Sequence, residues 1–237
     1  MIDRLELAQL WQSILQCDPN QLFGRDAVIL MDTDVGDDLP QPGFVGSSYR
    51  PSGVLFLGNN PGNGPSDSNK LNNLEIRHIR ALRNLKGATP DSLLVSFEEL
   101  MGALVPIMSE WGLVQKYVRP ILSGVNMDLD SIAYLNLFKW RSRIFKWRSS
   151  QELPAHAYRQ SWQEHTGEQH RLLRPKFVVA LGTVTFGKFK EVSRGSDTTG
   201  VRVFKLKRAR NDRQPLPPET VQLMPEIAEE IRRHYNG

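Results

Sequence analysis

The sequence predicts an α/β fold, a three-layer sandwich whose central sheet is mostly parallel and four-stranded. Two observations lead to this prediction. Short apolar runs alternate along the chain with longer segments of helical periodicity, and strands that alternate with helices form parallel sheets with helices on both faces. No change of composition marks a second domain. We therefore expect a single domain over residues 1–237, with its core at about 25–235.

The order of the expected elements follows from apolar periodicity and from the residues that interrupt it. Asp18-Pro19 ends the first helix, and Gly58 and Gly182 each end a strand. In chain order we expect a helix at 4–17, a strand at 27–31, a strand at 54–57, a helix at 71–85, a helix at 93–108 bent at Pro106, a strand at 131–135, a helix at 154–173, a strand at 176–181, an edge strand at 201–206, and a closing helix from Pro217-Pro218 to about His234. The last four strands are those expected to lie parallel.

Composition restricts the kinds of site that the chain can build. Cys17 is the only cysteine, which excludes a disulfide framework, a four-cysteine zinc site and a four-cysteine iron–sulfur cluster within this chain. The five histidines lack zinc-like spacing, and we expect no metal ion and no cofactor. A net charge of +4 permits an anionic partner such as nucleic acid. Without a run of about 18 apolar residues, and with a charged N-terminus, we expect a cytoplasmic protein that does not bind membranes.

Polar segments follow the four expected parallel strands. Ligands of such sheets bind outside the carboxyl ends of the strands. The four segments that occupy these positions are Gly58–Asn63, Asn136–Arg143, Gly182–Phe186 and Arg208–Gln214. If the strands are parallel, all four segments line one crevice, and the site should lie there.

The first segment is rich in glycine, proline and asparagine. It reads GNNPGNGP from Gly58 to Pro65, and its tight turn can direct backbone amides into the crevice. It lacks the ending of a P-loop and the spacing of a dinucleotide fingerprint. Taken alone, the turn is equally consistent with a loop that binds a phosphate, sugar or base and with a loop that binds nothing.

The second segment begins with Asn136, which directly follows an expected strand. Its amide offers both a donor and an acceptor, as the edge of a pyrimidine requires. The alternative is that Asn136 satisfies backbone groups of the loop. The third segment joins a strand to a helix, and we interpret Gly182 as a packing residue there.

Together these segments resemble the active-site motifs of the uracil-DNA glycosylase superfamily. Residues 54–62, VLFLGNNPG, are similar to the family's first motif, a strand followed by Gly-x-Asn-Pro-Gly or a related sequence. Residues 134–141, YLNLFKWR, are similar to the strand that ends in the uracil-reading asparagine, and residues 175–182, PKFVVALG, to the next strand and its glycine. The matches fall in family order over residues 50–215, and imply one uracil-DNA glycosylase-like domain.

The resemblance also implies roles for individual residues. Asn60 matches the position that orients or activates the attacking water, and an amide there can only position it. The base then leaves mainly through stabilisation of its anion. Asn136 matches the residue that reads the pyrimidine, and Asn59 and Gly62 border the pocket. The implied activity is hydrolysis of the N-glycosidic bond of uracil, or of a related damaged base, in DNA.

The chain departs from the family pattern at three places. Where the family has a His-Pro-Ser type motif, residues 206–213 read LKRARNDR, and Asn211 is the candidate to replace the histidine in catalysis. Between the first motif and Phe97 there is no Phe, Tyr or Trp to stack on the base, which leaves Leu71 or a ring from elsewhere. The cysteines of the iron–sulfur branch are absent.

Two carboxylates follow the first motif and are alternative candidates for a catalytic base. They are Asp67 and Glu75, and exposed loop or helix-cap roles are the commoner alternative for both.

Two basic clusters flank the expected crevice. One combines Lys139, Arg141, Arg143, Lys146 and Arg148 with Phe138, Trp140, Phe145 and Trp147; the other contains Arg202, Lys205, Lys207, Arg208, Arg210 and Arg213. Guanidinium groups suit phosphates, and rings stack on unpaired bases. We expect DNA, single-stranded or with a flipped base, to contact Lys139, Arg141, Arg143, Arg208, Arg210 and Arg213. The alternative is a solvated basic face with tryptophans in the core.

Two further functions remain open. One is a catalytically inactive nucleic-acid-binding module of the same fold, which the missing histidine and aromatic residue favour. The other is an enzyme that acts on a free nucleotide or nucleoside, which the basic clusters disfavour.

Overall fold

The computed structural model describes residues 2–27, 39–59, 69–85, 87–140, 153–196, 198–209 and 214–236, with only the backbone for residues 69–74. The strand predicted at 27–31 lies, apart from Ala27, outside these ranges. Residues 60–65 of the glycine-rich turn, residues 141–148 of the first basic cluster, and Arg210 and Arg213 of the second cluster also lie outside these ranges.

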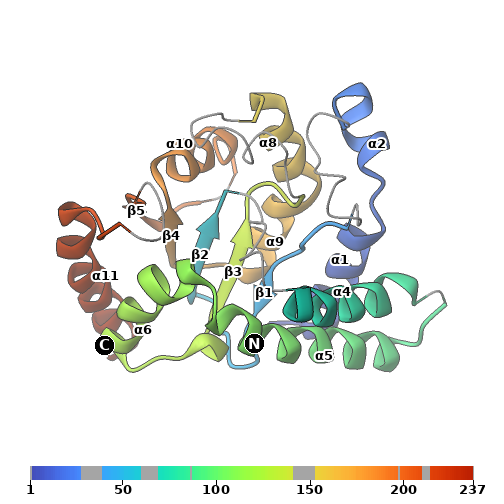
Figure 1. Ribbon diagram of the computed structural model, residues 1–237, viewed down its shortest axis with the longest axis horizontal. Helices are drawn as coiled ribbons and strands as arrows, with labels where there is room; N and C mark the ends of the chain where they lie inside the picture. The colour runs from blue at the N-terminus through green and yellow to red at the C-terminus, as the bar shows by residue number, and fades with distance from the viewer. Residues whose placement is uncertain are drawn as a thin grey trace.

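Within the described ranges, five strands form one sheet in the order β1-β3-β2-β4-β5 (Figure 1). They are β1 (Phe44–Val45), β2 (Val54–Gly58), β3 (Ile132–Asn136), β4 (Phe177–Leu181) and β5 (Arg202–Leu206). The last four are parallel, as predicted, while β1 is antiparallel to β3. The α/β class is therefore confirmed. The prediction of four strands was wrong, because a fifth, antiparallel strand makes the sheet mixed.

Nine α-helices accompany the described strands: α1 (Arg4–Gln16), α2 (Pro19–Phe23), α4 (Asn69–Asn84), α5 (Pro90–Ser109), α6 (Arg119–Val125), α8 (Ala155–Ser161), α9 (Gly167–Leu173), α10 (Thr183–Val192) and α11 (Pro218–Asn236). Several helix starts have a local cause. Asp3 caps α1 by accepting from the backbone of Leu5 and Glu6, and Pro90 and Pro218 stand first in their helices, where no backbone donor is required.

Four short helical segments complete the described elements. Two are π-helical turns: the first π-turn is Val114–Val118, directly before α6, and the second π-turn is Trp162–Thr166, between α8 and α9. The other two are 3₁₀ turns at Gly24–Asp26 and Leu129–Ser131. The helix predicted at 154–173 is thus one continuous path through α8, the second π-turn and α9. Single π-turns within helices are often found beside functional sites.

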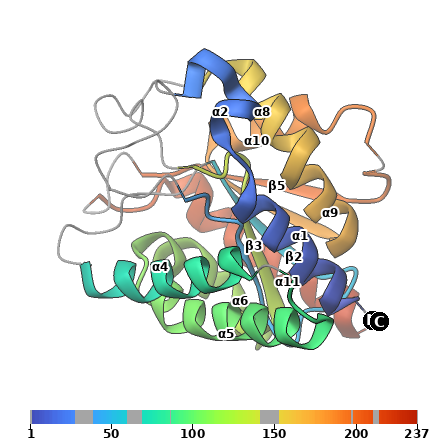
Figure 2. The ribbon, with the colours of Figure 1, turned by 90° about the vertical axis from the view of Figure 1, so that its right-hand side faces the viewer.

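The helices cover both faces of the sheet (Figure 2). Helices α4, α5, α6 and α11 lie on one side of it, and α8, α9 and α10 lie on the other. Helix α1 packs against α4, α5 and α9, so it lies over the β1 edge and connects the two layers.

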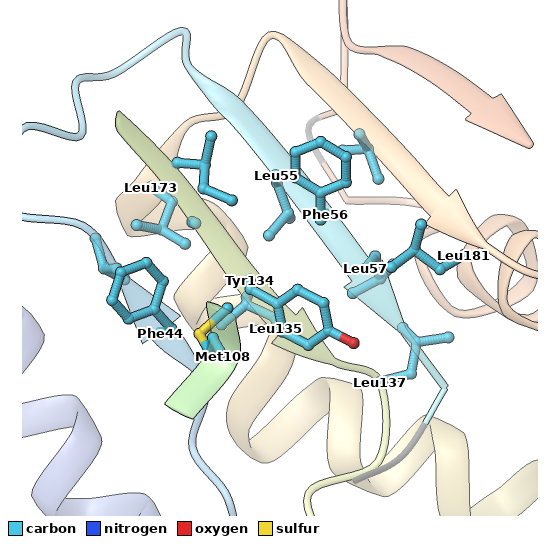
Figure 3. Close-up of a cluster of buried hydrophobic side chains, with 14 of the residues drawn as sticks. Phe44, Leu55, Phe56, Leu57, Met108, Tyr134, Leu135, Leu137, Leu173 and Leu181 are labelled. Atoms are coloured by element: carbon cyan, nitrogen blue, oxygen red, sulfur yellow. The ribbon is translucent and has the colours of Figure 1, made fainter. Parts of the chain in front are cut away.

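The core consists of the central strands and the helix faces turned toward them. Every residue of β2, β3 and β4 is buried, and Figure 3 shows side chains such as Phe56, Tyr134 and Leu181 packed on neighbouring strands. Strand β5 is only partly buried, as predicted for an edge strand. Buried parallel strands of this kind read as continuous apolar runs, which is why they were recognisable in the sequence.

Helix α5 has, alone among the described helices, the length and composition of a membrane span. Its buried residues include Phe97, Leu100 and Met101, and it packs against α1, α4 and β1. This is the environment of a core helix. Pro106 lies inside it, at the predicted position.

Candidate functional site

The carboxyl ends of β2 and β3 bring two asparagines together. Gly58 is paired with Asn136 in the parallel register. The pairing continues beyond the strands, because the Leu137 amide donates to the Gly58 carbonyl at 3.0 Å and the Phe138 amide to the Asn59 carbonyl at 2.9 Å. Asn59 and Asn136 therefore lie at the same end of the sheet, where the sequence predicted a shared crevice.

Both asparagines have an unsatisfied acceptor. The Oδ1 atoms of Asn59 and Asn136 are buried, and no group in the described part of the chain donates to either. Asn136 as a whole is only 4% exposed. A buried polar atom without a partner costs about 1–3 kcal/mol, so a ligand that donates to these oxygens would relieve that cost.

Gly58 makes room for the Asn136 side chain. Tyr134 and Asn136 are two residues apart on β3 and point to the same face. A Cβ atom on Gly58 would lie 2.3 Å from Asn136 Oδ1 and 2.9 Å from the Tyr134 hydroxyl. Close approach of these two side chains therefore requires glycine at position 58, whereas the sequence had suggested only a turn-forming role.

The backbone of Asn136 is held by side chains beneath it. Lys139 Nζ donates to the Asn136 carbonyl at 2.9 Å, and the Thr166 hydroxyl lies 3.2 Å from the carbonyls of both Asn136 and Leu137. The Ser161 hydroxyl donates to the Leu137 carbonyl at 2.8 Å. Thr166 belongs to the second π-turn, so that turn fixes the peptide that carries the asparagine.

The prediction that Lys139 contacts DNA was wrong. Its side chain is 0% exposed, and burial lowers its pKa well below the usual value, which favours the neutral amine. The rings of Phe138 and Trp140 are also buried, and both pack against Phe23. For these three residues, the first basic cluster is part of the core and not of a DNA-binding face.

A narrow cavity lies beside Asn136 on the α5 side of the sheet. Its volume is about 20 Å³, which is room for roughly one water molecule. It has an apolar wall and four polar residues, and its lining includes Gln41, Glu75, Tyr134 and Asn136 together with Phe44, Met108 and Trp111. The rings of Trp111 and Tyr134 meet edge to face, with centroids 5.8 Å apart. Trp111 thus places an aromatic ring in the same cavity lining as Asn136, from a part of the sequence far from the first motif.

Two of the polar residues of the cavity are hydrogen-bonded to each other. Gln41 Nε2 donates to Glu75 Oε1 at 2.6 Å, and Glu75 is 4% exposed. The phenol of Tyr134 is neutral, because burial raises its pKa to about 12 although the charge of Arg208 acts in the opposite direction. The expectation of an exposed helix-cap role for Glu75 is therefore replaced by a buried one.

Arg208 brings a positive charge to the same end of the sheet. It follows β5 and is exposed, and its Cδ lies 3.5 Å from where a Cβ atom on Gly182 would stand. Its charge reaches the Tyr134 phenol. Among the described members of the second basic cluster, Arg208 is thus the one whose charge acts on Tyr134.

The first π-turn holds the segment that follows Arg208. The Ala209 amide donates to the Tyr117 hydroxyl at 2.8 Å, and Lys116 Nζ lies 3.4 Å from the Gln214 carbonyl. The described residues Ala209 and Gln214 are therefore both hydrogen-bonded to this turn.

Several predicted site residues lie outside the described ranges. These are Asn60, Gly62, Asp67, Arg141, Arg143, Arg210, Asn211 and Arg213, and the side chain of Leu71 is also not described. Sequence reasoning missed Gln41, Tyr134 and Trp111. Only Tyr134 had a local signal, because a residue two positions before Asn136 on a strand must share its face.

Comparison with known proteins adds no assignment to this geometry. The sequence matches no protein-family model and no curated protein sequence.

Proposed function

We propose that this protein is a DNA glycosylase-like hydrolase that cleaves the N-glycosidic bond of uracil or a related damaged base. The observation that carries the proposal is the state of Asn136. Its peptide is held by Lys139 and Thr166, and its buried Oδ1 has no donor in the described part of the chain. A fixed amide with an unused acceptor, at the carboxyl end of a parallel strand, is suited to reading a ligand.

Uracil offers the groups that such an amide would read. Its N3–H can donate to Asn136 Oδ1, and its O4 can accept from Asn136 Nδ2. Asn59 Oδ1 provides a second acceptor, directly after the neighbouring strand. The four parallel strands, the glycine that precedes Asn59 and the resemblance of the strand-end motifs all support a uracil-DNA glycosylase-like domain.

The reaction follows from these groups. The bond between C1′ of the sugar and N1 of the base breaks, and its electron pair leaves with the base. Water oxygen bonds to C1′, with Asn60 as the expected positioning group. A positive charge near the base stabilises the leaving anion, and Arg208 is the described residue that supplies one beside Tyr134. DNA is the expected partner because this charge is exposed at the strand ends.

A single-turnover cleavage assay tests the proposal. Uracil-containing oligonucleotides, single- and double-stranded, are incubated with an excess of wild type, Asn136→Ala, Asn136→Asp or Asn60→Ala, with exposed Asn84→Asp as the control. Wild type and control should leave abasic sites. Asn136→Ala should weaken both binding and rate. Asn60→Ala should lower mainly the rate, by about 10²–10³ if it acts as oxyanion donors do.

Two results would redirect the proposal. Binding of the oligonucleotide by wild type without any abasic product would support the inactive nucleic-acid-binding module. Cleavage of free nucleosides but not of oligonucleotides would support an enzyme that acts on a free nucleotide or nucleoside.

A further inference from the structure

We propose that Glu75 accepts the proton of the attacking water and that Gln41 positions its carboxylate. This inference rests on the proposed function and names a catalytic residue for it. The starting observation is a buried carboxylate in the cavity that borders Asn136.

Three connections tie Glu75 to the base-reading asparagine. Glu75 and Asn136 line the same cavity. Gln41 Nε2 donates to Glu75 Oε1 at 2.6 Å, and the Gln41 backbone amide donates to the Lys139 carbonyl at 2.8 Å. Lys139 in turn donates to the Asn136 carbonyl. The Glu75 carboxylate and the backbone carbonyl of Asn136 are therefore connected by hydrogen bonds through Gln41 and Lys139.

The cavity supplies what a general base requires. It has room for roughly one water molecule, and a buried water needs two to four polar partners. Glu75, Gln41, Tyr134 and Asn136 supply polar groups around it. A carboxylate can take a proton from that water, whereas the amide of Asn60 in the first motif cannot.

Among the described residues that line the cavity, Glu75 is the group able to take the proton. Glu75 and Tyr134 are the titratable residues of the cavity lining, and the phenol stays protonated because its pKa is raised to about 12. Lys139 directs its amine to the Asn136 carbonyl, and Arg208 acts on Tyr134 from the strand ends.

The step balances without a further reactant. The water oxygen forms a bond to C1′ as the bond from C1′ to the base breaks. The electron pair of the broken bond leaves with the base as its anion. The proton lost by the water passes to the Glu75 carboxylate and from there to solvent.

A structural role is the competing explanation, since the bond between Gln41 and Glu75 also joins α4 to the segment before β1. The pH dependence of the single-turnover rate separates the two. The variants are Glu75→Gln, which keeps size and hydrogen bonding, and Glu99→Gln, which alters an exposed carboxylate on α5. The substrate is the uracil-containing oligonucleotide.

Wild type and Glu99→Gln should lose rate at low pH as the carboxylate is protonated. Glu75→Gln should lose this acid limb and be slower by about 10²–10⁴ at neutral pH, with unchanged affinity for the oligonucleotide. Gln41→Glu places a second carboxylate beside the first, which disfavours its ionisation, so the acid limb should move to higher pH.

The outcomes distinguish the two proposals. Cleavage by wild type with an unchanged rate and acid limb in Glu75→Gln overturns the role of Glu75 and leaves the glycosylase function in place. If Glu75→Gln does not fold, as judged by circular dichroism, an unmoved acid limb in Gln41→Glu overturns it instead. Absence of cleavage by wild type overturns both.

Discussion

Lys139 Nζ donates to the carbonyl of Asn136 at 2.9 Å from a completely buried position. Burial holds the pKa of this amine well below the usual value, which favours its neutral form. An unfolded chain would protonate this lysine up to about pH 10.4. Folding therefore requires loss of a proton over the pH range between the lowered pKa and about 10.4.

Lys139→Met should remove this pH dependence. In wild type the residue should make the free energy of unfolding rise with pH, by up to about 1.4 kcal/mol per pH unit. The Asn136 carbonyl keeps Thr166 as a donor in the variant, so its stability at high pH should differ from wild type by about 1 kcal/mol or less. Urea unfolding between about pH 6 and pH 9 measures the difference. Parallel curves for the two proteins would show that Lys139 is charged in the folded state.

Gly58→Ala should displace Asn136. The added methyl group would overlap Asn136 Oδ1 and crowd the Tyr134 hydroxyl, and overpacking of this kind costs about 1–3 kcal/mol. Gly102→Ala is the matched control, because a Cβ atom on this glycine of α5 meets no atom within 4 Å. It should stabilise the protein by about 0.5–1 kcal/mol. Thermal unfolding of both variants checks the contrast, and a stable Gly58→Ala protein with unaltered oligonucleotide binding would contradict it.

Arg208→Gln should weaken binding to DNA of any sequence. If Arg208 contacts one phosphate, the slope of log affinity against log salt should fall by about 0.7 for single strands and 0.9 for duplex. Arg202→Gln is the control, since Arg202 lies at the other end of β5 and pairs with Glu230 at 2.8 Å. Fluorescence anisotropy over a salt series provides the slopes. Equal slopes for wild type and Arg208→Gln would show that Arg208 contacts no phosphate.

Tyr117→Phe should free the backbone amide of Ala209. The variant loses the acceptor of the Ala209 amide, so hydrogen exchange at that amide should become faster. Tyr49→Phe is the control, because Tyr49 donates to the Leu173 carbonyl away from the carboxyl ends of the strands. It should leave exchange at Ala209 unchanged. A Tyr117→Phe protein with normal exchange at Ala209 would mean that the Tyr117 hydroxyl does not protect this amide.

The sequence was informative where structure depends on local patterns. Strands β2, β3 and β4 are buried on both faces, so each is a compact apolar run with a recognisable end. Asn136 was recognisable because it follows such a run. Strand β1 contains two residues in a stretch rich in glycine and proline, and it forms only because β3, distant in sequence, offers it a partner.

The missed parts of the candidate site depend on contacts between distant segments. Gln41 and Glu75 are 34 residues apart, and no periodicity relates them. The burial of Lys139 depends on its position beneath Asn136, next to the second π-turn. Alternating basic and aromatic residues have the same appearance in a core as on a nucleic-acid-binding face, which explains the error.

Strand β1 also affects how the protein behaves toward other copies of itself. Residues 41–48 form backbone hydrogen bonds along the outer side of β3, from the amide of Gln41 to that of Ser48. Helix α1 covers this edge. Without them, the amides and carbonyls of β3 would form an open edge, which readily pairs with strands of another chain. Residues 41–48 and α1 therefore cover an edge that would otherwise favour aggregation. A fragment reduced to the four parallel strands and their helices should be the form most prone to precipitate.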